Sequence, residues 1–123
     1  MQWNFTGSRP VYQQIMEQFR AAVLAGQYLP GSRIPSVRDL AVEAKVNPNT
    51  MQRALAELER EQLLVSHGTS GRCVTAEVDV LDGLRRDAVE QLVRDCARKF
   101  REAGLNMEQA AAMLLALEEK EEG

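Results

Sequence analysis

Apolar residues recur at three- and four-residue spacing across residues 10–25, which predicts an amphipathic helix. Pro10 is acceptable in a first helical turn, and Gly26 can adopt the left-handed conformation that ends a helix. The apolar stripe consists of Tyr12, Ile15, Phe19, Ala22 and Val23. This stripe needs a partner, and the turn signal Pro30-Gly31 soon afterwards directs the chain towards further elements.

Two shorter helices are expected next, each with a clear start signal. Ser36 with Asp39 three residues later is a variant of the capping box. Asn47 is a favourable N-cap, and Pro48 suits the first helical position. The expected buried positions are Val37, Leu40, Ala41 and Ala44 in the first helix and Met51, Ala54, Leu55 and Leu58 in the second. The spacing predicts two helices joined by a sharp turn.

A β-hairpin and two more helices complete the expected order. Short runs of strand-forming residues at 63–66 and 72–75 flank a glycine-bearing turn. Apolar positions then recur at helical spacing up to Gly104, and Asn106-x-x-Gln109 caps a last helix. The predicted fold class is therefore mainly α with a small β-hairpin wing. It divides into a winged helix-turn-helix at 1–76 and a two-helix tail at 77–123.

The order helix, short helix, turn, capped helix and hairpin is typical of a DNA-binding winged helix, in which the capped helix enters the major groove. Its exposed start offers amide and guanidinium groups of the kind that recognise adenine and guanine. Backbone N–H groups at the same end can bind phosphate. The candidate DNA-binding residues are Ser36, Arg38, Asn47, Asn49, Thr50, Gln52, Arg53, His67, Gly68 and Arg72.

Each candidate also has a structural interpretation. Asn47 can serve as a cap alone, and Asn49 and Gln52 can be ordinary solvated residues. Arg53 can pair with Glu57 one turn later. His67, the single histidine, can be a surface group. The four-element pattern is more specific than any of these residues taken alone.

Charge and chemistry narrow the function classes. The net charge is −3, but residues 1–76 hold eight basic against six acidic side chains, and residues 77–123 hold seven against twelve. The first segment is therefore mildly basic, which is compatible with phosphate contact. Cys73 and Cys96 are expected to be reduced and half-buried, with a disulfide or a thiol switch as the alternative. Neither a cofactor nor a metal site is expected, and no nucleophile–base pair or phosphate loop indicates an enzyme.

Two ordered motifs resemble the GntR family of bacterial transcription regulators. Residues 30–41, Pro-Gly-Ser-Arg-Ile-Pro-Ser-Val-Arg-Asp-Leu-Ala, are similar to its proline-glycine, then proline-serine-x-arginine-x-leucine-alanine signature. Residues 46–55, followed by Leu-Glu-Arg-Glu at 58–61, resemble its recognition helix in the form of the short-tailed YtrA-type subgroup. The resemblance covers about residues 10–75.

This resemblance implies DNA binding as a homodimer on a pseudo-palindromic operator, most often as a repressor of the protein's own operon. By position, it assigns DNA contacts to Arg38, Asn49, Thr50, Gln52, His67 and Gly68. The chain departs from the family at Lys45, where many members have glycine, so we expect either a slightly different turn or a modest backbone strain at Lys45. Pro48 and Gln52 replace residues that are basic in some relatives, which leaves the base preference open.

The segment after the wing is too short to enclose a small-molecule pocket by itself. We expect its apolar stripes to pair with those of a second chain, through Leu81, Leu84, Leu92, Phe100, Met113, Leu114 and Leu117. The alternative is a monomer whose tail folds back on its own winged helix. A small-molecule effector at the dimer interface is possible, but no residue identifies one.

The main hypothesis is thus a transcription regulator whose partners are double-stranded operator DNA and a second copy of itself. The alternative is a winged-helix protein-interaction module without DNA binding. The N-terminus lacks the pattern of a secretory signal and no stretch is long and apolar enough for a membrane span, so a cytoplasmic location is expected.

Overall fold

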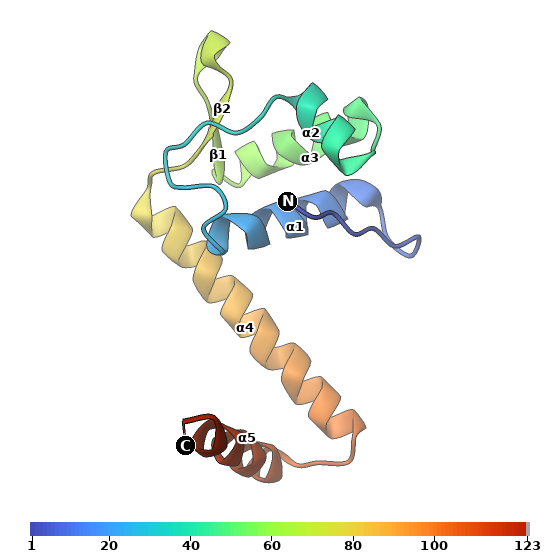
Figure 1. Cartoon of the computed structure of the whole chain (residues 1–123), viewed down its shortest axis with the longest axis vertical. Helices are drawn as coiled ribbons and strands as arrows, with labels where there is room; N and C mark the ends of the chain where they lie inside the picture. The colour runs from blue at the N-terminus through green and yellow to red at the C-terminus, as the bar shows by residue number, and fades with distance from the viewer. Residues whose placement is uncertain (123) are drawn as a thin grey trace. The chain divides into compact units, whose positions relative to one another are not determined.

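The computed structural model describes residues 1–122. Its elements are α1 (Val11–Leu24), α2 (Val37–Ala44), α3 (Pro48–Arg60), β1 (Leu64–Ser66), the 3-10 turn η1 (Gly68–Ser70), β2 (Arg72–Val74), α4 (Val78–Glu102) and α5 (Met107–Glu122) (Figure 1). This order confirms the predicted fold class, a mainly helical chain with a two-stranded wing. Residues Met1–Arg85 form one compact unit, and the remainder of the chain forms a second.

The core of the first unit is aliphatic and is built by α1, α2 and α3. Ile15 and Phe19 on α1 are fully buried, as are Leu40 on α2 and Leu55 on α3. The ring of Phe19 stacks on Tyr28 with centroids 5.0 Å apart. Because α3 contacts both α1 and α2, its apolar side is fixed while its other side remains available.

All three predicted helix caps are present. The Ser36 hydroxyl accepts a hydrogen bond from the Asp39 backbone N–H at 3.1 Å, and the Asn47 side chain accepts one from the Asn49 N–H at 2.7 Å. Asn106 and Gln109 form a reciprocal capping pair before α5. These local signals are readable from sequence because cap and partner lie two or three residues apart.

In the turn between α2 and α3, Lys45 adopts the left-handed conformation, which was one of the two outcomes expected from the sequence. Lys45 has φ 58°, in the left-handed region that glycine adopts most easily. Its N–H donates to the Val42 carbonyl, and the next N–H donates to Ala41, which closes the end of α2. Gln62, just after α3, also has a positive φ of 69°, which the sequence analysis did not anticipate.

We expect Lys45→Gly to raise the free energy of unfolding by up to about 1 kcal/mol, because glycine has no Cβ to clash in this conformation. Chemical denaturation followed by circular dichroism measures the change. Lys45→Ala is the matched control, since it removes the same exposed side chain but keeps the Cβ. Equal stability of the two variants would show that the backbone conformation at this position costs nothing.

The wing is a short antiparallel hairpin with Leu64 paired to Val74 and Ser66 paired to Arg72. The segment before α2 runs along its other edge, where Ile34 N–H donates to the Arg72 carbonyl and Val74 N–H donates to Ser32. Only Leu64 and Val74 of the two strands are buried. The inner end of the hairpin is therefore anchored to the core, and residues 67–70 at its tip are exposed.

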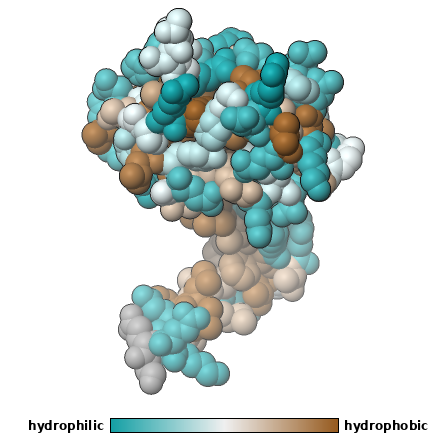
Figure 2. Space-filling view, turned by 45° about the horizontal axis from the view of Figure 1, so that its top comes forward, coloured by the Kyte–Doolittle hydropathy of each residue, from teal (hydrophilic) through white to brown (hydrophobic). Residues whose placement is uncertain are grey.

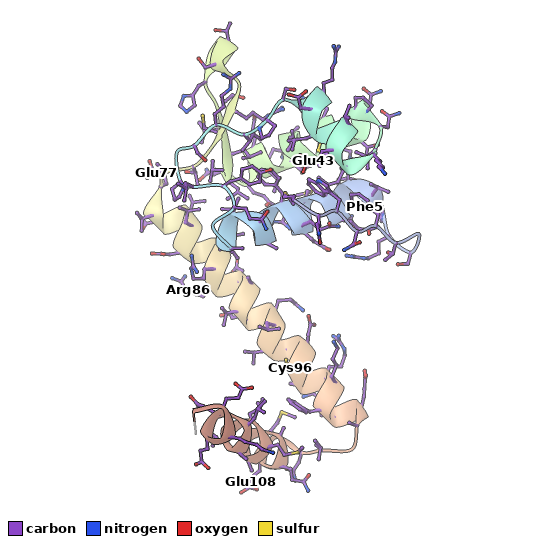
Figure 3. The ribbon with its side chains drawn as sticks, in the orientation of Figure 1. Phe5, Glu43, Glu77, Arg86, Cys96 and Glu108 are labelled. Atoms are coloured by element: carbon purple, nitrogen blue, oxygen red, sulfur yellow. The ribbon has the colours of Figure 1, made fainter. Side chains whose placement is uncertain are left out.

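An N-terminal arm, residues 1–9, packs along α1 and was not predicted. The Gln18 amide donates to the carbonyl of Asn4 and accepts from its N–H, and buried Gln14 makes the same pair of bonds with Thr6. The Trp3 indole donates to Glu43 on α2 at 3.1 Å. Phe5 and Glu43 mark the arm and α2 in Figure 3.

The first unit extends beyond the wing into the start of α4. Leu81 and Leu84 are partly buried against the core of the first unit. The predicted boundary lay between residues 76 and 77, whereas the division by contacts falls after Arg85. These two leucines belong to the helical stripe expected of the tail, but their first contacts are with the winged helix.

The second unit consists of the rest of α4 and α5 and leaves much apolar surface uncovered. Leu92 on α4 is 62% exposed, and Leu114 on α5 is 54% exposed. Phe100 is half-buried, and Ala110 is buried. Figure 2 shows apolar side chains at the surface of these helices. No helix within residues 1–122 is long and apolar enough to cross a membrane.

The cysteines differ from expectation in one respect. Cys73 on β2 is half-buried as predicted, but Cys96, which lies along α4 in Figure 3, is exposed. The prediction of a half-buried Cys96 is wrong because its helix has no buried residue along its length. Both thiols are free.

Candidate nucleic-acid interface

The start of α3 is exposed on one side and fully anchored on the other. Asn47, Asn49 and Gln52 are exposed, and Thr50 is half-buried. On the opposite side Met51 is completely buried, and so are Ala54, Leu55 and Leu58. Pro48 at the first position leaves the helix start without one N–H, while Asn47 satisfies another. The arrangement presents polar side chains outward from a rigid helix, as a groove-reading element requires.

The preceding helix adds a free positive charge. Ser36 and Arg38 are both exposed at the start of α2. Within the described residues, no carboxylate lies within ion-pair distance of the Arg38 guanidinium. An unpaired arginine in the helix before α3 is suited to a phosphate contact.

Arg53 contacts an aromatic ring instead of pairing with Glu57. Its guanidinium carbon lies 3.8 Å from the centroid of the Tyr12 ring on α1, a cation–π contact. Glu57, its suggested partner, instead accepts from Arg60 at 3.3 Å. The Arg53 side chain is therefore directed towards Tyr12 on α1.

The wing tip is shaped by two glycines with positive φ, 57° at Gly68 and 86° at Gly71. His67 N–H donates to the Gly71 carbonyl at 2.9 Å and closes the tip, while the His67 side chain stays exposed. The Arg33 guanidinium lies against Gly71, where an added Cβ would be 3.4 Å from its Nε. Sequence reasoning did not single out Arg33, because only the three-dimensional pairing of residues 31–34 with β2 brings it to the wing.

A hydrogen-bond network joins the wing to α3 through Glu59. Its Oε1 accepts from the Ser66 hydroxyl and from Arg72 Nε, both at 2.6 Å. Arg72 Nη1 in turn donates to the Gln52 Oε1 at 3.3 Å. The hydrogen bonds from Ser66 and Arg72 lower the pKa of Glu59 below its usual value, so the carboxylate is ionised at neutral pH.

Glu59 and Ser66 were not predicted as site residues. The only sequence signal is that Gln52 and Glu59 are seven residues apart, which places them on one side of a helix. Arg72 was predicted as a wing residue, and the structure brings it onto α3 as well.

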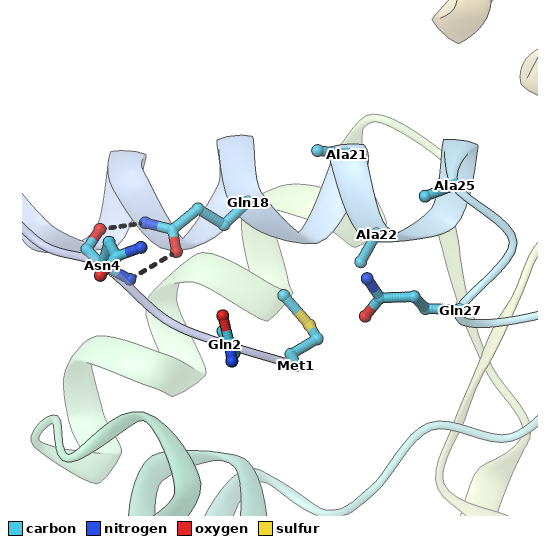
Figure 4. A pocket seen from close by; sticks show the side chains of 8 residues that line it. All are labelled: Met1, Gln2, Asn4, Gln18, Ala21, Ala22, Ala25 and Gln27. Atoms are coloured by element: carbon cyan, nitrogen blue, oxygen red, sulfur yellow. Dashed lines mark hydrogen bonds between the residues drawn. The ribbon is translucent and has the colours of Figure 1, made fainter.

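An open pocket of about 490 Å³ lies between the N-terminal arm and α1 (Figure 4). Its walls include Met1, Gln2 and Ala21, and the Gln18 amide on its rim is engaged by Asn4. None of the predicted DNA-binding residues lines it. The pocket is thus separate from the exposed side of α3.

The first unit is a winged helix of the DNA-binding class. It has three helices and a two-stranded wing, and its third helix is capped and exposed at its start. The family model described as "Bacterial regulatory proteins, gntR family" matches residues 11–74. The chain belongs to this family of DNA-binding transcription regulators.

Individual relatives are similar to this protein over most of the chain. The transcriptional repressor YtrA of Bacillus subtilis (strain 168) is 34% identical over 93 residues, which cover 72% of each protein. A GntR family transcriptional regulator from Listeria monocytogenes superposes with a TM-score of 0.83 and 31% identity, covering 91% of this chain and 98% of that one.

A DNA-bound structure is also similar. AraR(DBD) in complex with operator ORX1 has a TM-score of 0.56 and 26% identity, covering 61% of this chain and 96% of that one. These similarities support the DNA-binding regulator. They give no support to the alternative of a protein-interaction module without DNA binding.

Proposed function

We propose that the protein represses transcription by binding, as a homodimer, to a pseudo-palindromic operator. The observation that supports this most directly is the exposed polar start of α3 above a fully buried apolar side. The similar YtrA is a repressor, and the similar AraR domain binds an operator. Because operator DNA is the partner, we place the activity in the cytoplasm and assign the chain no catalytic role.

The proposed contacts divide into base readout and phosphate binding. Asn49 and Gln52, both exposed on the start of α3, are assigned to base edges in the major groove. Arg38 and Thr50 are assigned to phosphates on either side of that groove. Asn47 caps the helix start through the Asn49 N–H, and the remaining N–H groups of the first turn are assigned to a phosphate.

The outer contacts come from three other places. Ser36, exposed at the start of α2, lies beside Arg38 in sequence and shares its phosphate role. Arg53, stacked on Tyr12, offers its donors to the backbone near α1. His67 and Gly68 at the wing tip approach the neighbouring backbone or minor groove, where a backbone with positive φ and no side chain permits close contact.

The dimer interface is proposed on the second unit. Its exposed apolar residues have no partner within the described chain, and water-exposed apolar faces of this kind usually mark an interface. The residues assigned to it are Leu92, Phe100, Met113, Leu114 and Leu117. Leu81 and Leu84, predicted for the same interface, belong to the first unit and pack against its core, where they are assigned a supporting role.

Two recognition helices in one dimer address half-sites about 34 Å apart, one turn of the duplex. The second half-site then binds at a high effective concentration, which compensates for the few cations of each winged helix. An effector bound between the two chains would act on this spacing, but the chain's residues identify no such molecule.

Two substitutions test the proposed face. Arg38→Ala should weaken binding to all duplexes and reduce the salt dependence of log K by about one counterion. Asn49→Ala should cost about 1–3 kcal/mol on the preferred operator and little on random DNA, because only a base contact is lost. Fluorescence anisotropy titrations at several salt concentrations separate these effects.

Arg60→Ala is the matched control for Arg38→Ala. It removes an arginine from the far end of α3 that pairs with Glu57 on the surface. We expect its operator affinity to equal that of the original protein. If Arg60→Ala weakened binding as much as Arg38→Ala, or if Arg38→Ala and Asn49→Ala both bound normally, the assigned face would be wrong.

A further inference from the structure

We propose that Arg72 is a positioning residue that, held by Glu59, fixes the side-chain amide of Gln52 and so sets the base preference at one operator position. This inference rests on the proposed function, since Gln52 must face a base pair for the preference to exist. It assigns Arg72 a role on α3 instead of a direct phosphate contact from the wing.

Glu59 of α3 anchors the Arg72 side chain. One carboxylate oxygen, Glu59 Oε1, receives both the Arg72 Nε–H and the Ser66 hydroxyl at 2.6 Å. Ser66 lies on β1 and Arg72 on β2, where the two residues are paired in register. A single acidic residue of α3 therefore holds both strands of the wing. The Arg72 side chain is only 17% exposed, so its orientation is constrained.

The anchored Arg72 directs its Nη1–H groups at Gln52. A guanidinium is planar and rigid, so fixing Nε also fixes where its Nη1–H groups point. In this structure Nη1 points at Gln52, whose Oε1 accepts at 3.3 Å. The Gln52 oxygen is therefore turned towards the wing, and its NH2 group remains available on the exposed side of α3.

The orientation of the Gln52 amide decides which base edge it can bind. A glutamine that reads adenine uses both amide atoms, accepting from N6 and donating to N7. With its oxygen directed towards Arg72, Gln52 presents N–H donors, which match the O6 and N7 acceptors of guanine. The oxygen keeps a second lone pair, but the bond to Arg72 sets its direction. The geometry thus favours guanine at the position Gln52 faces and disfavours the paired contact to adenine.

Charge supports a positioning role over a phosphate contact. The positive charge of Arg72 is neutralised by Glu59 at hydrogen-bond distance. A phosphate approaching Arg72 also meets that carboxylate, so the pair contributes little to counterion release. Arg38, by contrast, has no such partner among residues 1–122.

The test is selection of bound sequences from a pool of random-sequence duplexes by the full-length protein. The original protein should enrich a palindrome with guanine preferred at one position per half-site. Arg72→Met keeps the apolar stem but removes the donors, and should shift that single position towards adenine, or flatten it, by about fivefold or more. The other positions should keep their preferences.

Two further variants separate positioning from charge and from folding. Arg72→Lys keeps the charge but has no fork, so it should behave like Arg72→Met; restored guanine preference in Arg72→Lys would overturn the inference. Glu59→Gln weakens the anchor while leaving Arg72 in place, and should shift the same position in the same direction. This variant keeps the inference testable if Arg72→Met fails to fold by circular dichroism.

Gln52→Ala, combined with Arg72→Met, gives a double-mutant cycle. It should remove the preference at that position, and adding Arg72→Met to it should change nothing further there. A further change in the double variant would mean that Arg72 reads the DNA itself. If the original protein enriches no sequence, the proposed function fails; if it enriches a palindrome that Arg72→Met leaves unchanged at every position, only the positioning role fails.

Discussion

Replacing Leu92 and Leu114 together by aspartate is expected to convert the proposed dimer into a monomer and to lower operator affinity about 100-fold or more. Each leucine is more than half exposed in the described chain, one on α4 and one on α5. Burying an unpaired carboxylate in an apolar interface is costly, so association should fail. The affinity falls because the second winged helix no longer binds at a high effective concentration.

Sedimentation velocity measures the oligomeric state, and titration of the operator duplex measures the affinity. Leu29→Asp is the control, since Leu29 is 65% exposed but lies in a turn of the first unit. It should remain dimeric and bind normally. A double variant that stays dimeric, or a monomer that still binds the full operator tightly, would contradict the proposed interface.

Phe19→Ala is expected to lower the free energy of unfolding by about 3–5 kcal/mol, a large part of the stability of a small domain. The side chain is completely buried in α1, and its ring stacks on Tyr28, so truncation leaves a cavity and removes an aromatic contact. Because α1 packs against α3, the loss should also loosen the packing of α3 and weaken DNA binding.

Urea denaturation followed by circular dichroism checks this value. Gln13→Ala on the exposed side of the same helix is the control and should change stability by less than about 0.5 kcal/mol. A loss below about 1 kcal/mol for Phe19→Ala would mean that the surrounding residues close the cavity at little cost.

The sequence was most informative where a signal and its partner are neighbours. Ser36 and Asn47 were recognised as caps because their partners lie two or three residues away. The left-handed Lys45 was one of two expected outcomes, the other being a different turn, because it stands where many relatives have glycine. The exposed start of α3 followed from apolar spacing alone, although the DNA role of each residue there stays a prediction.

Contacts between distant residues could not be predicted in the same way. Glu59 and Arg72 are thirteen residues apart and come together only when the hairpin folds back on α3. The arm depends on Gln18 reaching Asn4 across fourteen residues, and no apolar period indicates such a bond. The division after Arg85 has no signal in the sequence, because the helical spacing of α4 continues unchanged across it.

The docking of the arm on α2 has a practical consequence. Trp3 is the only tryptophan in the chain, and its indole donates to Glu43 and stacks on Phe5. Its intrinsic fluorescence therefore reports on this one contact, which lies on the same short helix as Arg38. The protein contains its own optical probe, so unfolding of the arm and events at α2 can be followed in solution without attaching a dye.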